Sequence, residues 1–181
     1  EAHADVLVFS DANSLFNAES LRALVSPFAD PTVGGVAGDQ RYRRERSRSG
    51  ATGGETLYWD YDRVLKVAES RGGNVVSATG AIYAIRRSLF QRIPPGVTDD
   101  FFVSTGVIAA KQRLVFEPRA VAFEATAGSS GAEFSRKVRI MTRGLWGVRT
   151  RRELLDPFRY GFYALQLASH KVLRRLVVFP L

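Results

Sequence analysis

The fold is decided by a short stretch near the start of the chain, Asp5-Val6-Leu7-Val8-Phe9-Ser10-Asp11-Ala12-Asn13. The apolar run 5–9 predicts a short strand, and Asp11 and Asn13 come just past its C-terminal end. Open α/β sheets bind ligands outside the carboxyl ends of their strands. Side chains at i and i+2 of an extended segment point to the same side, and Asp and Asn oxygens suit Mg²⁺ or Mn²⁺. The alternative is a strand-end turn in which Asp11 or Asn13 caps backbone N–H groups.

The composition is that of a globular domain whose positive charge gathers in its last third. The chain has 181 residues, of which 45% are hydrophobic and 24% charged, with no cysteine and two histidines. Thiolate metal sites are therefore excluded, and a histidine-rich metal site is disfavoured. The net charge is +8, and residues 134–181 hold many basic residues against only Glu153 and Asp156. Such a basic segment implies an anionic partner, which is nucleic acid, a diphosphate or a membrane surface.

Strands and helices are expected to alternate along the chain. Apolar runs predict strands at 5–9, 33–42, 75–85, 114–117 and 120–124. Helical periodicity and capping residues predict helices at 17–28, 55–71, 98–112 and 132–150, and a further helix from Pro157. This alternation predicts an α/β fold with a mainly parallel sheet flanked by helices.

Two further segments carry groups that suit chemistry at a sheet edge. Thr98-Asp99-Asp100 begins a predicted helix, and the helix dipole stabilises the charged form of a carboxylate in the first turn. That form is the one that a general base needs. The small residues of Ser77-Ala78-Thr79-Gly80-Ala81 would let a ligand approach the backbone closely. The alternatives are an ordinary helix N-terminus and a tight turn.

The predicted helix 132–150 is basic. Arg139 and Arg143 lie four residues apart and therefore share a face of this helix. Guanidinium groups offer bidentate hydrogen bonds to phosphate, so this face is a candidate diphosphate site. The alternative is a solvated basic face with no ligand.

Taken in order, these segments resemble family 2 glycosyltransferases of the membrane-associated polysaccharide-synthase type, which include the poly-N-acetylglucosamine, hyaluronan and cellulose synthases. The resemblance covers about residues 5–175. The matching runs are Val8-Phe9-Ser10-Asp11-Ala12-Asn13, Glu55-Thr56-Leu57-Tyr58-Trp59-Asp60-Tyr61, Leu65-Lys66, Glu69-Ser70, Ser77-Ala78-Thr79-Gly80-Ala81-Ile82-Tyr83-Ala84-Ile85-Arg86-Arg87, Thr98-Asp99-Asp100-Phe101, Glu133-Phe134, Arg136-Lys137-Val138-Arg139, Arg143-Gly144 and Ser169-His170-Lys171.

The resemblance implies roles for the acidic residues. Asp11 matches the metal-binding acid of the family's Asp-x-Asp motif, and Asn13 stands at its second acidic position. Asp100 matches the catalytic base of the Glu/Asp-Asp motif, and Asp99 is the neighbour that orients the base or the acceptor. The segment Thr79-Gly80-Ala81 matches the loop at the acceptor end of the pocket.

The resemblance also implies a role for the basic helix. Arg143 falls at the arginine of the Gln-x-x-Arg-Trp motif, which holds the nucleotide diphosphate, and Arg139 shares its face. Ile140 stands at the Gln position and Gly144 at the Trp position, so the motif is incomplete. Because the missing Trp helps to shape the acceptor path, the resemblance does not carry over processive transfer.

The implied activity is inverting transfer of a sugar from a nucleotide-sugar, with UDP favoured, to a glycan or lipid-linked acceptor in polysaccharide biosynthesis. The implied cofactor is Mg²⁺ or Mn²⁺. The implied fold is of GT-A type, with a mixed, mainly parallel sheet flanked by helices, and the first hundred or so residues of that fold hold the base and ribose. We therefore expect residues 1–150 to be the C-terminal part of the catalytic domain, which alone binds donor weakly and does not turn over.

The end of the chain predicts contact with a membrane. Residues 151–181 combine aromatic residues with a basic cluster and finish on an apolar run, which suits an interfacial helix leading toward a truncated transmembrane segment. We expect a membrane-associated protein at the cytoplasmic face, multi-pass in its full length. The alternative is an amphipathic helix packed on the domain's own core.

Two rival functions remain open at this point. The run Arg41-Tyr42-Arg43-Arg44-Glu45-Arg46-Ser47-Arg48 could track phosphates in a nucleic-acid-binding basic α/β domain. No zinc-finger spacing or RNA-recognition aromatic motif supports that interpretation, so nucleic acid is the disfavoured partner. The second rival is a non-catalytic scaffold module.

Overall fold

The computed structural model describes residues 4–43, 53–125 and 130–173. The basic run 44–48 and the final apolar run 176–181 lie outside the described residues, so the interpretations that depend on them stay predictions. The strands and helices have these bounds: β1 Val6–Phe9, β2 Leu15–Phe16, α1 Ser20–Val25, β3 Val33–Arg43, α2 Gly53–Gly72, β4 Tyr83–Arg86, α3 Asp99–Ala109, β5 Arg113–Ala125, α4 Ser130–Thr150, α5 Pro157–Tyr160 and α6 Phe162–Leu167. Short 3₁₀ turns follow α1, β4 and α4, and a π-helical turn, Ala168–Leu173, follows α6.

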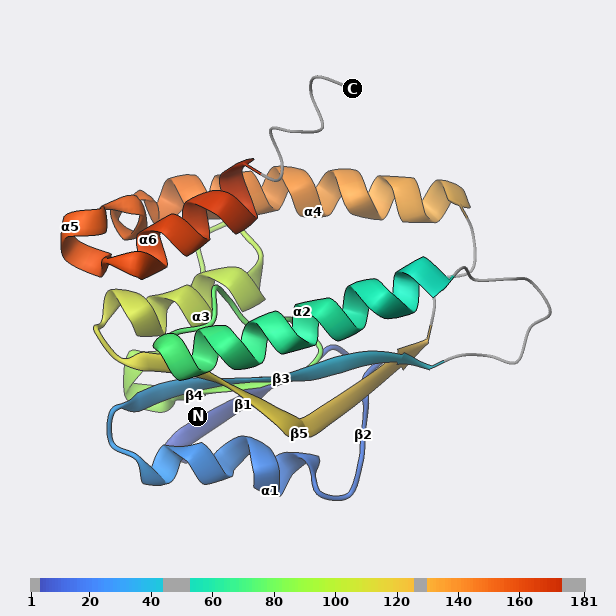
Figure 1. The fold of residues 1–181 in the computed structure, drawn as a ribbon, viewed down its shortest axis with the longest axis horizontal. Helices are drawn as coiled ribbons and strands as arrows, with labels where there is room; N and C mark the ends of the chain where they lie inside the picture. The colour runs from blue at the N-terminus through green and yellow to red at the C-terminus, as the bar shows by residue number, and fades with distance from the viewer. Residues whose placement is uncertain (1–3, 44–52, 126–129, 174–181) are drawn as a thin grey trace.

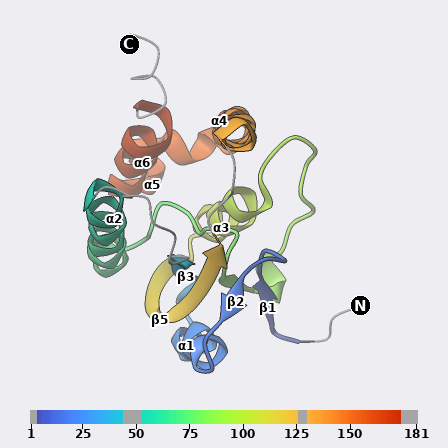
Figure 2. The same ribbon diagram turned by 90° about the vertical axis from the view of Figure 1, so that its right-hand side faces the viewer.

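The elements form layers on the two faces of one sheet. Figure 1 shows α1 against one face, α2 and α3 against the other, and α4, α5 and α6 in an outer layer beyond α3. The end-on view in Figure 2 shows the same order, with α3 between the sheet and α4. The predicted mixed sheet flanked by helices is therefore confirmed.

The sheet has five strands in the order β1-β4-β3-β5-β2, and its strand directions differ from the prediction. Only β3 and β5 pair in parallel, whereas β1–β4, β3–β4 and β2–β5 are antiparallel. The prediction of a mainly parallel sheet is thus wrong for these strands. β1, β3 and β5 run in one direction, and β2 and β4 run in the other.

The physical reason lies in the chain between α2 and β4. A helix between two strands usually returns the chain for a parallel pairing, but here an extended segment makes one more traverse before β4 begins. The N–H of Val75 donates to the carbonyl of Leu114 at 3.0 Å, at the start of β5. At the other end of the segment, the N–H of Gly38 donates to the carbonyl of Ile82 at 3.0 Å. β4 therefore enters the sheet from the opposite end.

The two strands predicted around Pro118 form one bent strand, β5. Its register against β3 shifts between Gly38↔Glu117 and Asp39↔Val121. Proline has no N–H to donate to a ladder, so an irregularity at this position is expected. The bend carries the far half of β5 on to pair with β2, which brings Glu124 beside the turn that follows β1.

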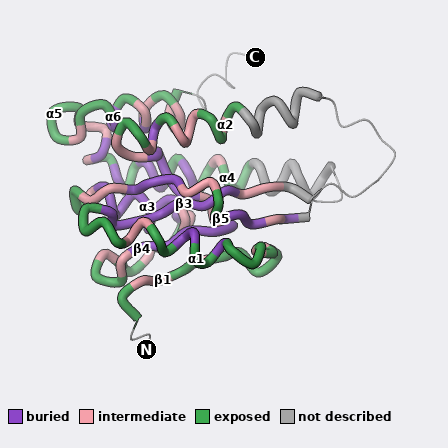
Figure 3. Tube along the Cα trace, turned by 60° about the horizontal axis from the view of Figure 1, so that its bottom comes forward, coloured by how far each residue is buried: buried purple, intermediate pink, exposed green. Residues whose placement is uncertain are grey.

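Alternating side chains fill two cores, one on each face of the sheet. One hydrophobic cluster lies on the face of the sheet that α3 covers, and the other lies on the face that α1 covers. In β4, Tyr83 and Ile85 belong to the first cluster, whereas Ala84 belongs to the second. This is the two-residue period of a strand buried on both faces. Figure 3 shows the buried residues running along the central strands and α3.

The C-terminal segment packs onto the larger of these cores. Leu154, Tyr163 and Leu167 belong to the cluster under α3, and the hydroxyl of Tyr163 donates to the carbonyl of Val76 at 2.8 Å. One face of the predicted amphipathic helix is therefore buried in the domain. The described helices include none that is both long enough and apolar enough to span a bilayer.

Candidate functional site

The Asp11 turn and the loop 79–81 form one structural unit. The N–H of Asp11 donates to the carbonyl of Gly80 at 3.0 Å, and the hydroxyl of Ser10 donates to the carbonyl of Ala81 at 3.2 Å. The N–H of Ser14 closes the turn on the carbonyl of Asp11 at 3.1 Å. The two segments that the sequence singled out are therefore neighbours at the C-terminal end of β1.

The Asp11 carboxylate lies against Gly80. A Cβ at position 80 would stand 2.9 Å from Oδ2 of Asp11, closer than real Cβ atoms approach, and 3.1 Å from Oδ1, so the carboxylate would have to shift. The buried hydroxyl of Thr79 has no hydrogen-bond partner in the part of the chain that the structure describes. Ala81 is fully buried and supports the loop from below.

Negative charge is concentrated around Asp11. Burial raises the pKa of the Asp11 carboxyl, and the charges of Glu124, Asp99 and Asp100 raise it further. Glu124 is only 4% exposed. The hydroxyl of Ser14 donates to one of its oxygens at 3.0 Å, and the Nε2 of Gln40 donates to the other at 2.7 Å. Sequence reasoning missed Glu124, although a glutamate inside an otherwise apolar strand was the available signal.

The donor set at this turn fits a hard divalent cation that also takes phosphate oxygens. The side chains of Asp11 and Asn13 are exposed, and the crowding of carboxylates around Asp11 is relieved by a bound cation. The described residues contain no group of three or more His, Asp or Glu side chains that could hold a metal alone. Mg²⁺ and similar ions commonly use one or two carboxylates together with substrate phosphates.

Asp100 lies in the first turn of α3, as the sequence predicts. Thr98 occupies the N-cap position, but its side chain makes no capping hydrogen bond and instead bonds to the Asp100 carboxyl. The N–H of Phe101 donates to Oδ1 of Asp100 at 2.7 Å. The next helical residues, from Phe101 to Ile108, are buried, so the carboxylate is fixed on a rigid element. Asp99 beside it is exposed.

The environment of Asp100 raises its pKa above the ordinary value of an aspartate. Burial raises the pKa of this carboxyl and is the largest cause, and the charge of Asp99 acts in the same direction. The hydrogen bonds from Thr98 and Phe101 and the charge of Lys171 oppose that rise. A carboxyl with a raised pKa accepts a proton more readily than an ordinary aspartate, which suits a general base.

A cavity of about 520 Å³ opens beside Asp100. Its lining comes from α2, from the segment 76–79, from the start of α3 and from the π-helical turn after α6. The polar side chains that line it are Gln40, Tyr61, Asp62, Lys66, Glu69, Ser77, Thr79, Asp100, His170 and Lys171. Thr79 and Asp100 thus face one space, whereas Gly80 faces Asp11.

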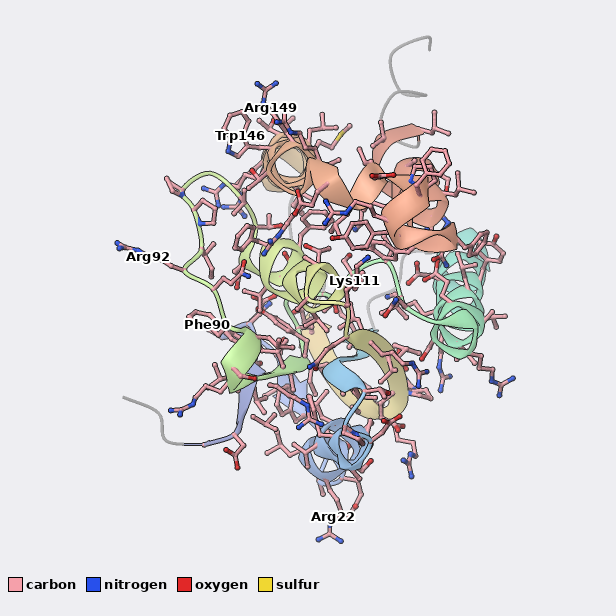
Figure 4. All side chains as sticks on the ribbon, turned by 90° about the vertical axis from the view of Figure 1, so that its left-hand side faces the viewer. Arg22, Phe90, Arg92, Lys111, Trp146 and Arg149 are labelled. Carbon is pink, nitrogen blue, oxygen red and sulfur yellow. The ribbon has the colours of Figure 1, made fainter. Side chains whose placement is uncertain are left out.

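The structure does not join the two predicted arginines to this cavity. Arg139 and Arg143 are exposed on α4, and among the described residues no hydrogen bond or ion pair links them to Asp11 or Asp100. α4 approaches α3 through Gly147, where a Cβ would stand 2.8 Å from the ring of Phe101. Farther along, Trp146 and Arg149 lie on the outer side of α4 (Figure 4).

The comparisons with known proteins agree with this arrangement. Residues 1–147 match the family model described as glycosyltransferase like family 2. A solved mannosyltransferase of Pyrobaculum calidifontis, in complex with GDP-mannose and Mn²⁺, is similar to this chain with a TM-score of 0.68 and 24% sequence identity. The likeness covers 94% of this chain and 46% of that one, so the chain spans about half the length of this relative. A comparison with curated proteins finds no match.

At this identity the structural likeness bears on the fold alone, and it supports the predicted GT-A-like arrangement of sheet and helices. The family is shown by the family model, which extends from the first residue into α4 and includes Asp11, the loop 79–81 and Asp100. The chain therefore belongs to glycosyltransferase family 2, and its described residues have the GT-A-like fold.

Proposed function

We propose that the full-length protein to which this chain belongs transfers a sugar, with inversion at the anomeric carbon, from a nucleotide-sugar to the hydroxyl of a glycan or lipid-linked acceptor. Membership of the family supports nucleotide-sugar transfer. One observation carries the proposal, which is that the loop 79–81 lies between the candidate metal ligand Asp11 and the candidate base Asp100. Gly80 lies against the Asp11 carboxylate, and Thr79 and Asp100 line the same cavity. A substrate bound along this loop would have the metal ligand Asp11 on one side of its reacting carbon and the base Asp100 on the other.

Asp100 is the proposed base. A hydroxyl is a weak nucleophile, so its proton must move to a positioned acceptor as the oxygen attacks. The acceptor O–H proton goes to the Asp100 carboxylate, the oxygen forms a bond to the anomeric carbon, and the bond from that carbon to the diphosphate oxygen breaks. Asp99 is the proposed orienting neighbour. Thr79, Gly80 and Ala81 supply the acceptor end of the pocket.

Asp11 and Asn13 are the proposed ligands of a divalent cation, Mg²⁺ or Mn²⁺. Such a cation, when bound, neutralises the charge that develops on the leaving diphosphate. Arg139 and Arg143 are the proposed diphosphate-binding side chains on α4, where both are exposed and available to a ligand. The similar mannosyltransferase was solved with GDP-mannose and Mn²⁺, which gives no support to the prediction of UDP as the donor nucleotide.

The test of the base is Asp100→Asn in the full-length protein. Release of the nucleoside diphosphate is followed for a panel of sugar nucleotides with Mn²⁺ or Mg²⁺. Loss of a general base costs about 10²- to 10⁴-fold in rate. We expect that loss with donor affinity unchanged in calorimetry, because the amide keeps the shape of the side chain.

The matched variant is Asp99→Asn, which makes the same chemical change at the exposed neighbouring residue. We expect a smaller loss, since Asp99 orients but does not take the proton. Near-normal transfer by Asp100→Asn would rule out the base. Absence of transfer by the wild-type protein with every donor would rule out the function.

The outer face of the C-terminal helices is proposed to lie on a membrane surface. Phe158 is 98% exposed, Phe162 72% and Leu165 58%, while their neighbours Tyr163 and Leu167 pack into the core. Exposed aromatic and aliphatic side chains that are followed in the sequence by basic residues suit the interface of an anionic bilayer. This surface would hold the acceptor side of the cavity near a lipid-linked substrate.

Co-sedimentation with vesicles tests this surface. We expect the chain to bind vesicles that contain phosphatidylserine, and the combined Phe158→Ser, Phe162→Ser and Leu165→Ser variant to lose most of that binding. Leu21→Ser serves as the control, because Leu21 is 51% exposed on α1 at the opposite face of the sheet. Equal binding by the wild type and the triple variant would exclude this face as the membrane contact.

A further inference from the structure

The π-helical turn Ala168–Leu173 forms one wall of the cavity beside Asp100. Two of its side chains, His170 and Lys171, line that cavity together with Asp100. π-helical turns are rare in proteins and are often found at functional sites. The function proposed above assigns no role to either residue.

Acidic and basic side chains occur together around this cavity. Lys66 contacts Asp62 at 2.8 Å, and both residues come from α2. Nδ1 of His170 lies 3.3 Å from Oε1 of Glu69, whose side chain is only 6% exposed. The ammonium of Lys171 lies 5.8 Å from the ring centroid of Phe101, the residue that follows Asp100. The turn thus brings basic groups to carboxylates on α2 and α3.

The turn is also anchored independently of these charges. Its preceding helix α6 is held by Leu167, which is fully buried, and by the hydrogen bond from the Tyr163 hydroxyl to the carbonyl of Val76 at 2.8 Å. Val76 belongs to the segment that lines the cavity. A displacement of α6 would therefore move Lys171 relative to Asp100.

We propose that the turn Ala168–Leu173 completes the transfer site, with Lys171 as a positioning residue that keeps the Asp100 carboxylate charged and oriented. In this arrangement His170 packs beside Glu69 of α2, with its Nδ1 3.3 Å from Oε1. The proposal rests on the proposed function, in which Asp100 is the base. It makes the C-terminal segment a part of the chemistry as well as of the fold.

The charges around Asp100 support this role. Burial raises the pKa of the Asp100 carboxyl, and Lys171 is the cation that lowers it. Lys171 also lowers the pKa of Glu69. The other charged or titratable groups around Asp100 and its cavity are Asp99 on its own helix, Asp11 after β1, Tyr83 on β4, Tyr61, Asp62, Lys66 and Glu69 on α2, and His170 on the turn. Without Lys171 the ionised form of Asp100 loses a nearby opposite charge.

The test uses Lys171→Met and Lys171→Arg in the full-length protein, with transfer measured against pH. Removing a neighbouring opposite charge raises the pKa of a carboxylate, by about one unit or more for a close neighbour. We expect the acid limb of kcat/KM to move to higher pH by about one unit in Lys171→Met, with about a tenfold loss below the midpoint. Lys171→Arg keeps the charge and should keep the wild-type limb.

Lys66→Met is the matched control, because it removes a lysine from the same cavity whose partner is Asp62. We expect its acid limb to stay at the wild-type midpoint. An unchanged limb in Lys171→Met, or an equal loss at every pH, would overturn the proposal, since a purely structural role lowers the rate without moving the limb.

A second measurement needs no sugar donor. Carbodiimide labels protonated carboxyls, so peptide mass spectrometry gives the pH midpoint for labelling of Asp100 directly. We expect that midpoint to rise in Lys171→Met and to return in Lys171→Arg. An unmoved midpoint would overturn the coupling of Lys171 to Asp100. If the wild type transfers no sugar while the midpoint moves, the proposed function fails and the coupling stands.

Discussion

The carboxylates at the two ends of the loop 79–81, Asp11 and Asp100, have different charged neighbours. At the Gly80 end, partial desolvation of the Asp11 carboxyl and the charges of Glu124, Asp99 and Asp100 raise its pKa. At the Thr79 end, Asp100 shares its cavity with basic side chains, and Lys171 opposes the rise in its pKa. The neighbours of Asp11 are acidic, whereas Asp100 has both acidic and basic neighbours.

This difference indicates what each end is prepared for. A carboxylate crowded by other carboxylates gains most from a cation that arrives with the substrate. A base takes up a proton in its ionised form, and a cationic neighbour such as Lys171 favours that form without an added ion. The comparison therefore predicts that metal-related defects follow changes at the Asp11 end and that pH-related defects follow changes at the Asp100 end.

At the Asp11 end of the loop, the largest effect is expected from Asp11→Asn. Replacing the charged ligand should lower the apparent affinity for the metal by about 100-fold or more. Removing even an indirect partner of a metal ligand costs about 10- to 100-fold in metal affinity. The measurement is the Mn²⁺ or Mg²⁺ concentration at half-maximal transfer in the full-length protein. The acid limb of the pH profile, which reports Asp100, should change far less. An unaltered metal requirement would remove Asp11 from the metal site.

A smaller effect is expected from Gly80→Ala. The added Cβ would stand 2.9 Å from Oδ2 of Asp11, so the carboxylate must shift away from the loop. We expect about a tenfold higher metal requirement, a typical cost of misplacing a metal ligand. Gly72→Ala is the control, because a Cβ at position 72 meets nothing within 4 Å. Equal behaviour of the two variants would show that the close approach at Gly80 has no functional consequence.

The sequence was sufficient to predict where Asp11 and Asp100 lie in the secondary structure. Asp11 follows a strand and Asp100 lies in the first turn of a helix, and both positions are readable from neighbouring residues. The direction of β4 was not readable, because it depends on the extended segment from Val75 to Ile82 pairing with distant strands. Glu124 was missed for a similar reason, since only the bend at Pro118 carries it to the Asp11 turn.

Lys171 and His170 are further residues whose contacts could not be predicted from the sequence. The resemblance included both residues but gave them no role, because their partners Asp100 and Glu69 are far away in sequence and come together only when α6 packs on α2 and α3. Arg139 and Arg143 show the converse. The sequence motif assigns them a ligand, and the described structure leaves both exposed on α4. Their role stays a prediction.

The smallest effect is expected from Glu69→Gln, and it concerns stability rather than transfer. Burial is the largest cause of a raised pKa at Glu69, whose ordinary value is 4.5. A carboxyl whose pKa is higher in the folded protein favours folding while it is protonated, and that contribution is lost as pH rises through the folded value. The free energy of unfolding should therefore decline above about pH 4.5 in the wild type. The decline should be shallower in Glu69→Gln, because glutamine does not ionise. Asp11 and Asp100 also have raised pKa values, so some decline remains.

Urea unfolding at about pH 4 and about pH 7 measures the difference, with Glu19→Gln, an exposed acid next to α1, as the control. Parallel curves for the wild type and Glu69→Gln would mean that Glu69 is as well solvated in the folded chain as in the unfolded one, and the contact with His170 would then be a surface contact rather than part of the cavity wall.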